Sequence, residues 1–253
     1  MELENTNKTS LVPDDQVGIR TFVEAFLQDP LAHLPRSRIL RYQTGQVIYS
    51  EDKPSTGIHV VIEGKVTVCR RGDNGRPVVV DIYHMGEFFG ESALSHCPDL
   101  LEQAVALQDT EVMTWTTAEI EGIVVRRPEL AVALMQILVR RLTDYRSRLH
   151  SFATDGISPR LVRALIHLSE RLGHTNKDGS MQMIPLTHEL ISQYVGTSRE
   201  VVTHFMNRFR REGYLNYSRS AGIVVQRHAL MEWLNQQRQV ANPPRAQGAA
   251  TAS

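Results

Sequence analysis

The stretch GEFFGESALSHCPDLLEQAVA, residues 86–106, has the residue types of a loop that admits a small ligand. Two glycines flank an aromatic pair and allow a ligand to approach the backbone. A glutamate follows directly, and a small apolar run closes the stretch. Its far end carries a glutamate and a glutamine, where a phosphate group would need a cation. The candidate pocket residues are Gly90, Glu91, Ser92, Glu102 and Gln103.

A second candidate site lies at residues 198–212, where the spacing predicts a helix with two chemically different sides. Arginine can bind guanine with two hydrogen bonds, glutamate can accept one from cytosine, and asparagine can pair with adenine. The polar side is therefore suited to read base edges, and the alternative is an ordinary solvated helix face. The polar residues are Arg199, Glu200, Thr203, His204, Asn207, Arg210 and Arg211, and the apolar ones are Val201, Val202, Phe205 and Phe209. The hydroxyls of Thr187 and Ser198, at predicted helix starts, suit contacts to phosphate.

The other reactive residue types form no pattern of this kind. His59, His84, His96, Cys69 and Cys97 are scattered, so the sequence predicts no enzyme, no metal site and no cofactor. Two cysteines are too few for a disulfide framework or a four-thiolate cluster. Haem ligation through His59, His96 or Cys97 stays an open alternative, which an absorbance spectrum of the purified protein tests.

Charge is unevenly distributed along a chain whose formal net charge is zero. Residues 1–157 contain 16 Lys and Arg against 22 Asp and Glu, whereas residues 158–227 contain 10 against 5. The basic segment favours nucleic acid as a partner, with a merely soluble surface as the alternative. No apolar run approaches the roughly 20 residues that span a bilayer, and the polar N-terminus is unlike a signal peptide. We therefore expect a cytoplasmic protein with no membrane partner.

Between residues 39 and 115 the sequence is typical of short strands separated by turns. The segments RILRY, QVIYS, IHVVIEGKVTVCR and PVVVDIYH are rich in β-branched and aromatic residues, and glycines recur between them. Many short strands with frequent glycine turns predict a sandwich or roll of antiparallel strands.

The period then changes to that of a long helix beginning at Pro128, a residue well placed in a first helical turn. Apolar residues recur at spacings of three and four over about 25 residues, which predicts a seam for a second helix. Packing inside its own subunit is the alternative. The seam residues are Leu134, Leu138, Leu142, Tyr145, Leu149 and Phe152. The segment TDGISP (154–159) predicts the end of this helix and a short hinge.

The last third of the chain predicts three helices followed by a hairpin. The segment SPRLVRALIHLSERLG predicts an amphipathic helix that ends at Gly173. Thr187 is a predicted N-cap and Gly196 a predicted stop for a short second helix, and the third helix follows after almost no connection. This spacing is typical of a helix-turn-helix. The segment YLNYSRSAGIVVQR then predicts two strands around a turn, a wing.

These segments resemble the CRP/FNR (cyclic-AMP receptor protein/fumarate–nitrate regulator) family of bacterial transcription factors. The resemblance lies in LTHELISQYVGTSREVVTHFMNRFRREGYL, in GKVTV and GEFFGESAL, and in VRRLTDYRSRL, in the family's order over about residues 35–227. It implies a homodimer joined through the long helix, with Leu138, Leu142, Tyr145 and Leu149 at the interface. It also implies a two-fold symmetric double-stranded DNA site. Arg199 and Glu200 fall on the family's guanine- and cytosine-reading positions, whereas His204 replaces the usual arginine.

The resemblance also allows the ligand of the front domain to be tested position by position. Glu91 matches the glutamate that holds the ribose of cyclic AMP in the family. At the phosphate-binding Arg-Ser pair this chain has Glu102 and Gln103, and the small hydroxyls of the dimer helix are replaced by Tyr145 and Arg146. We therefore expect no cyclic-AMP binding in the usual pose. The pocket is either vestigial or retuned to another effector that uses Arg146 or Arg148.

Two further ligand classes follow from the resemblance. A larger dinucleotide such as cyclic di-GMP, held elsewhere on the protein, is a speculative alternative to a nucleotide in the pocket. The iron–sulfur members of the family need four cysteines, and this chain has two.

The fold expected is α+β: an N-terminal jelly roll of the cyclic-nucleotide-binding type, a long dimerisation helix and a C-terminal winged helix-turn-helix. The expected boundaries are 17–127, 128–155 and 156–238, with flexible tails at 1–16 and 239–253. The expected function is a homodimeric, sequence-specific transcription regulator. The alternative is a small-molecule sensor that acts through protein partners. Activation would need a surface that contacts RNA polymerase, and no loop in the sequence indicates one.

Overall fold

The computed structural model describes residues 34–72, 75–95, 101–218 and 221–241 of the 253-residue chain. The expected N-terminal tail, the first residues of the expected front domain and most of the expected C-terminal tail lie outside these ranges. His96 and Cys97, two of the candidate haem ligands, lie outside them as well. Among the described residues, no helix has the length and apolar character needed to cross a bilayer.

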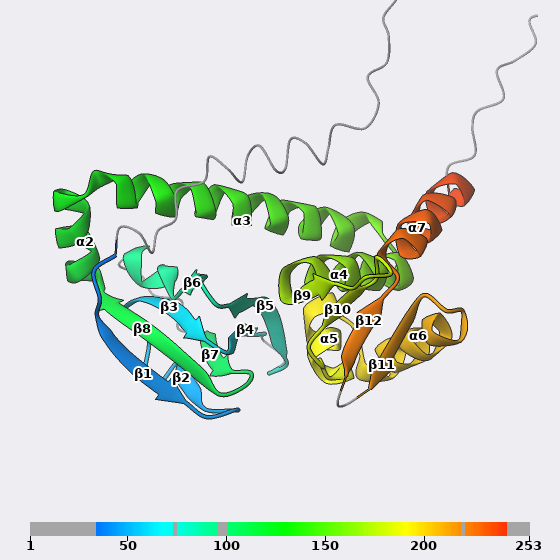
Figure 1. The fold of residues 1–253 in the computed structure, drawn as a ribbon, viewed down its shortest axis with the longest axis horizontal. Coiled ribbons are helices and arrows are strands. Elements are labelled where there is room, and N and C mark those ends of the chain that lie inside the picture. The colour runs from blue at the N-terminus through cyan, green and yellow to red at the C-terminus, as the bar shows by residue number, and fades with distance from the viewer. Residues whose placement is uncertain (1–33, 73–74, 96–100, 219–220, 242–253) are drawn as a thin grey trace, which may run out of the picture.

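Short antiparallel strands fold the described N-terminal part into a roll, as the sequence predicted (Figure 1). One four-stranded sheet has the order β1-β8-β3-β6, and the other has the order β2-β7-β4-β5. The strands are β1 (Arg38–Tyr42), β2 (Val47–Tyr49), β3 (Gly57–Glu63), β4 (Lys65–Arg71), β5 (Pro77–His84), β6 (Phe88–Phe89), β7 (Glu102–Ala106) and β8 (Thr110–Thr116). A 3-10 helix, η2 (Glu91–Ser95), follows β6. The candidate pocket residues thus lie on η2, just before it, and at the start of β7.

The interior of the roll is filled by β-branched and aromatic side chains from both sheets. Val66 and Val68 of β4 are buried, as are Tyr83 of β5 and Phe89 of β6. The register pairs Val66 with Tyr83 on one side and with Ala106 on the other, so the centre of the roll is closely packed. This rigid core positions η2 and the start of β7.

Helix α2 (Thr117–Arg126) was not predicted from the sequence. It begins with a capping box, in which Thr116 accepts from the Glu119 backbone N–H and the Glu119 carboxylate accepts from the Thr116 N–H. These reciprocal bonds satisfy two backbone donors that a helix start leaves free.

Helix α3 (Pro128–Thr154) begins with proline in its first turn, as predicted. Its first turns pack on the roll through Leu130 and Leu134, which are buried. The rest of the helix runs past the roll to the C-terminal domain (Figure 1). One helix therefore contacts both parts of the molecule.

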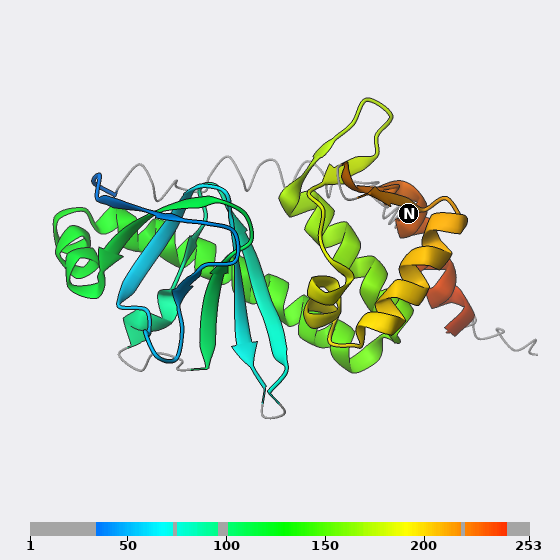
Figure 2. The same ribbon diagram turned by 90° about the horizontal axis from the view of Figure 1, so that it is seen from below.

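The C-terminal domain has the predicted helices and wing, with three elements that the sequence analysis missed. Its elements are α4 (Ile157–Leu172), β9 (Gly173–Thr175), β10 (Met181–Met183), α5 (His188–Val195), α6 (Arg199–Arg211), β11 (Leu215–Ser218), β12 (Gly222–Val225) and α7 (Arg227–Ala241). The sheet order is β11-β12-β10-β9, and β9 and β10 form a hairpin that projects from the domain (Figure 2). Missed were β9, β10 and α7. Helix α7 extends through residues 239–241, which we expected to belong to the tail.

The two domains share one apolar cluster at their junction. Val79 and Ile82 of β5 are buried in the same cluster as Leu165 of α4, Ile191 of α5 and Phe209 of α6. Strand β5 is thus the part of the roll against which the helix-turn-helix domain packs.

Candidate DNA-binding surface and effector pocket

The turn between α5 and α6 is fixed by caps at both of its sides. Thr187 accepts a hydrogen bond from the Leu190 N–H, and α5 ends at Gly196, whose φ is 71°. A Cβ at Gly196 would lie 2.7 Å from a ring carbon of Phe152, so this left-handed residue also makes room for the end of α3. Ser198 then caps α6 by accepting from the Val201 N–H. The sequence predicted both cap residues and the glycine stop.

The inner side of α6 packs into the domain core. Val202, Met206 and Phe209 are fully buried, and Phe205 is only partly buried. The sequence analysis placed Phe205 in the core and overlooked Met206. The next residue along the chain, Met206, takes the central position because successive helical residues are 100° apart.

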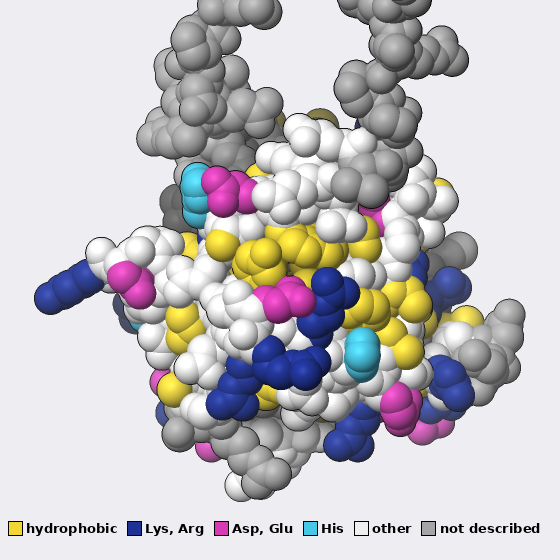
Figure 3. Space-filling view, turned by 90° about the vertical axis from the view of Figure 1, so that its right-hand side faces the viewer, with side chains coloured by type: hydrophobic (Ala, Val, Ile, Leu, Met, Phe, Trp, Pro, Cys, Tyr) yellow, Lys and Arg dark blue, Asp and Glu magenta, His cyan; other side chains and the backbone are white. Residues whose placement is uncertain are grey.

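The outer side of α6 carries most of the predicted base-reading residues. Arg199, Glu200, His204, Asn207 and Arg211 are exposed. A shallow hollow on this side is lined by His204, Asn207, Arg210 and Arg211. Lys and Arg side chains gather on the end of the molecule that the C-terminal domain forms (Figure 3).

Two of these side chains are held by neighbouring elements. The Thr203 hydroxyl donates to the Arg199 carbonyl and lies 2.9 Å from His188 Nδ1. The Tyr217 hydroxyl, from the wing strand β11, donates to Asn207 Oδ1 at 2.8 Å. The wing therefore orients one of the residues that we expect to face DNA.

The candidate effector pocket is narrow around Gly90. Its φ of 82° suits glycine, and a Cβ would lie within 3 Å of the Gly57 carbonyl, the His59 ring and the Ser55 hydroxyl. His59 is buried, and its ring nitrogens lie 3.1 Å from Ser55 Oγ and 3.0 Å from Thr114 Oγ1. Burial lowers the pKa of His59 to about 4, so the ring is neutral near pH 7. Both of its nitrogens are already engaged.

An arginine that the sequence analysis did not name occupies the pocket. The Arg141 guanidinium on α3 lies 3.0 Å from Glu91 Oε1 and donates to the Phe88 carbonyl. It also stacks over the rings of Tyr83 and Phe88, at 4.7 and 4.3 Å from their centroids. Glu91, the expected ribose ligand, is thus paired with a side chain of the same chain.

The position of Arg146 corrects one of our expectations. Arg146 is exposed, and the basic residue beside Glu91 is Arg141. Five residues of helix correspond to about 140° of rotation, so the two arginines point in different directions. Tyr145 is only 40° from Arg141 on the same basis and is largely buried, and burial raises its pKa to about 12.

The start of β7 is held by Tyr49 and Ser92. The Tyr49 hydroxyl donates to Glu102 Oε1 at 2.5 Å, and Ser92 Oγ lies 3.4 Å from the same oxygen. Burial and the Glu102 carboxylate both raise the pKa of Tyr49. Gln103 is paired with Cys69 in the adjacent strand. Two carboxylates, Glu91 and Glu102, therefore border the pocket where the family's phosphate ligands would lie. Within the described part of the chain, no cluster of His, Cys, Asp and Glu could hold a metal ion.

The predicted seam of α3 is exposed along most of its length. The exposed fraction is 37% for Leu138, 48% for Leu142 and 69% for Leu149. Met135 and Val139 beside them are also exposed. Packing within the subunit covers Leu134 but leaves this stripe uncovered.

Two arginines connect the domains across the junction. Arg171 of α4 pairs with Asp81 of β5, and its second nitrogen lies 2.9 Å from Glu87 Oε1. Arg148 of α3 donates to the carbonyls of Val79, Val80 and Tyr194. Asp81 is buried, so its partner is needed to offset the cost of burying a charge.

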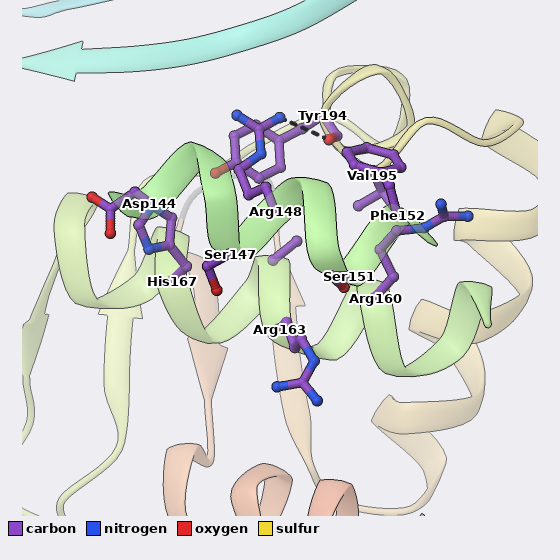
Figure 4. Close-up of a pocket in the computed structure, with 11 residues that line it drawn as sticks. Asp144, Ser147, Arg148, Ser151, Phe152, Arg160, Arg163, His167, Tyr194 and Val195 are labelled. Carbon is purple, nitrogen blue, oxygen red and sulfur yellow. Dashed lines mark hydrogen bonds between the residues drawn. The ribbon is translucent and has the colours of Figure 1, made fainter. Parts of the chain in front are cut away.

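A cleft of about 170 Å³ lies beside this junction, between α3, α4 and α5 (Figure 4). Asp144, Ser147, Arg148, Ser151 and Phe152 line it from α3; Arg160, Arg163, Ala164 and His167 from α4; and Tyr194 and Val195 from α5. The sequence analysis named Arg148 as a possible effector ligand but gave no sign of this cleft, because its walls come from helices that meet only in the fold.

This architecture, a jelly roll joined by a long helix to a winged helix-turn-helix, defines a two-domain regulator of transcription. Two family models match the chain: a cyclic nucleotide-binding domain at residues 39–127 and a Crp-like helix-turn-helix domain at residues 159–233. The chain belongs to the CRP/FNR family of transcription regulators.

Known members of the family are similar over most of the chain. A CRP-like cAMP-activated global transcriptional regulator of Mycobacterium tuberculosis is 26% identical over 184 residues, covering 72% of this chain and 82% of that protein. The cAMP-activated global transcriptional regulator of Haemophilus influenzae is 26% identical over 221 residues, covering 83% and 95%. The solved structure of a CRP/FNR family transcriptional regulator from Thermus thermophilus aligns with a TM-score of 0.63 at 26% identity, covering 78% and 98%.

Proposed function

We propose that this chain is a homodimeric transcription regulator that reads a two-fold symmetric DNA site with α6. The observation that carries the proposal is the outer side of α6, where Arg199, Glu200, His204 and Asn207 are exposed beside a tightly capped turn. A recognition helix needs its polar side free and its apolar side anchored, and α6 has both.

The residues on α6 divide into base readers and phosphate contacts. Arg199 suits guanine and Glu200 suits the amino group of cytosine. Hydrogen bonds from the Glu200 backbone N–H and the Ser198 side chain lower the pKa of Glu200, so it accepts as a carboxylate. Arg211, at the far end of the helix, and Thr187, at the start of α5, suit phosphate oxygens.

The exposed stripe of α3 is the proposed dimer interface. Apolar side chains at heptad-like spacing are stable in water only when a second helix covers them. A second copy of α3, packed against Leu138, Leu142, Tyr145 and Leu149, would place two α6 helices on one DNA site.

We propose further that the front domain does not bind cyclic AMP in the usual pose, unlike the cAMP-activated relatives. Glu102, at a phosphate-binding position, would repel the cyclic phosphate, and Arg141 already pairs with Glu91. Tyr145 takes up space where the family has small hydroxyls. The regulator would then bind DNA without a nucleotide, or respond to a different effector.

Selection from random oligonucleotides, with and without a panel of nucleotides, tests the site and the effector together. We expect a palindromic site in the absence of nucleotide, and the same site when cyclic AMP is added. Arg146→Ala, an exposed change on α3, is the matched control for variants of α6. Recovery of no consensus sequence would contradict the proposal.

A further inference from the structure

The cleft between α3, α4 and α5 lies on a different side of α3 from the exposed stripe. At 100° per residue, Leu138, Leu142 and Leu149 lie within about 40° of one another, whereas Ser147 and Ser151 lie roughly 140–180° around the helix. A second α3 packed on the stripe would therefore leave these cleft walls uncovered. Of the lining residues, Phe152 lies at the edge of the stripe.

The cleft contains positive charge that no described carboxylate pairs with. Arg148 uses its donors on backbone carbonyls, and Arg160 stacks over the Phe152 ring at 4.7 Å. Neither takes part in an ion pair with a described residue, whereas Arg163 pairs with Asp155 at 2.7 Å. Asp144 is the acidic residue in the lining. The balance of the cleft therefore favours an anion.

Unpartnered polar atoms point to the same conclusion. Tyr194 is 97% buried, yet its hydroxyl has no hydrogen-bond partner among the described residues. The same is true of the buried Nε of Arg160. A buried polar group without a partner costs free energy, so each such group in a native fold needs an explanation. A ligand oxygen in the cleft would supply the acceptor that Arg160 lacks and a partner for the tyrosine hydroxyl.

We infer that this cleft binds a small organic oxyanion, a carboxylate or phosphate on a compact apolar body. About 170 Å³ is well below the roughly 300–1,000 Å³ typical of sites for drug-sized ligands, so the volume excludes a cyclic dinucleotide. The guanidinium of Arg160 and the Tyr194 hydroxyl bind the oxyanion. Phe152, Ala164 and Val195 contact the apolar body.

A ligand in this position acts on the junction between the domains. Arg148 lines the cleft and also holds β5 and α5 together through the carbonyls of Val79 and Tyr194. Phe152 lines it too and contacts Gly196, the residue that ends α5. Binding here therefore changes the orientation of the helix-turn-helix relative to α3.

Phenyl phosphate is a suitable probe, because it joins an oxyanion to a small aromatic body. We expect isothermal titration of the full-length chain to show saturable binding at one site per subunit, and phenol, which lacks the charge, not to bind. Arg160→Gln should weaken binding about tenfold or more, and Tyr194→Phe, which keeps the ring, by about two- to tenfold. Arg146→Gln, an exposed change on the same face of the molecule's long helix as no lining residue, should leave binding unchanged.

Three results would overturn the inference: no binding of phenyl phosphate at millimolar concentration, unchanged binding in Arg160→Gln, or equal binding of phenol. Mobility-shift assays on the same preparations separate this outcome from a failure of the proposed function. A chain that binds its DNA site but not phenyl phosphate refutes the cleft alone. A chain that binds phenyl phosphate but no DNA refutes the proposed function and leaves the cleft assigned.

Discussion

Shortening Leu149 on α3 is expected to weaken the proposed dimer by an amount that the structure allows us to calculate. The side chain is 69% exposed in the single chain, and a partner helix would cover that part. Full burial of a leucine stabilises by about 1.5–3 kcal/mol, so the covered part contributes about 1–2 kcal/mol per copy. Each substitution is present twice, so Leu149→Ala should cost the dimer about 2–4 kcal/mol. That corresponds to a rise in the dimer Kd of about thirtyfold to several hundredfold.

Sedimentation equilibrium over a concentration series measures this shift directly. Val125→Ala is the matched control, because Val125 is 82% exposed on α2 and lies outside the stripe. The double variant Leu142→Glu, Leu149→Glu would place four carboxylates along the interface, and we expect it to be monomeric. If the double variant sediments as the wild-type dimer does, the stripe is not the interface and the assembly argument fails.

Three further predictions concern the DNA site, the pocket and the junction. Arg199→Ala should cost about 1–3 kcal/mol on the best site and relax one base pair per half-site, whereas Arg211→Ala should weaken all sequences alike and lower the salt slope by about one. Equal losses on specific and random DNA for Arg199→Ala would exclude base reading. Isothermal titration with cyclic AMP should show no micromolar binding, and one nucleotide buried per subunit would refute this. Arg171→Met leaves Asp81 buried without its guanidinium and should lower the unfolding free energy by about 3 kcal/mol, against at most about 0.5 kcal/mol for the exposed Arg208→Gln. Equal denaturation midpoints for these two variants would show that the Asp81 pair contributes little.

The helix-turn-helix was predictable because its signals are local. Thr187, Gly196 and Ser198 each act within a few residues of their own position, so a cap or a stop can be recognised without the fold. Helix α7 also had a local signal that we overlooked. Leu230, Trp233 and Leu234 have helical spacing and are buried.

The pocket and the cleft were less predictable because their partners are far apart in the sequence. Arg141 meets Glu91 across 50 residues, and Arg171 meets Asp81 across 90. Alignment with a family motif led us to Arg146, since a motif gives positions along a helix but not which of them faces a neighbour. Strands β9 and β10 have three residues each, too few for a periodic pattern to be distinguished.

The arrangement of side chains on α3 explains how control can pass from the pocket to the hinge. In the front domain, Glu91 is already paired with Arg141, so a nucleotide would have to displace a partly buried ion pair before binding. At the junction, the contacts of Arg171 and Arg148 are of the order of 3–5 kcal/mol. A ligand shifts such an equilibrium only by the difference in its affinity for the two states. Millimolar affinity for one state already corresponds to about 4 kcal/mol, which is comparable to the contacts at the junction. A weakly bound small anion in the cleft is therefore sufficient to reorient α6, whereas the closed pocket offers a nucleotide no comparable advantage.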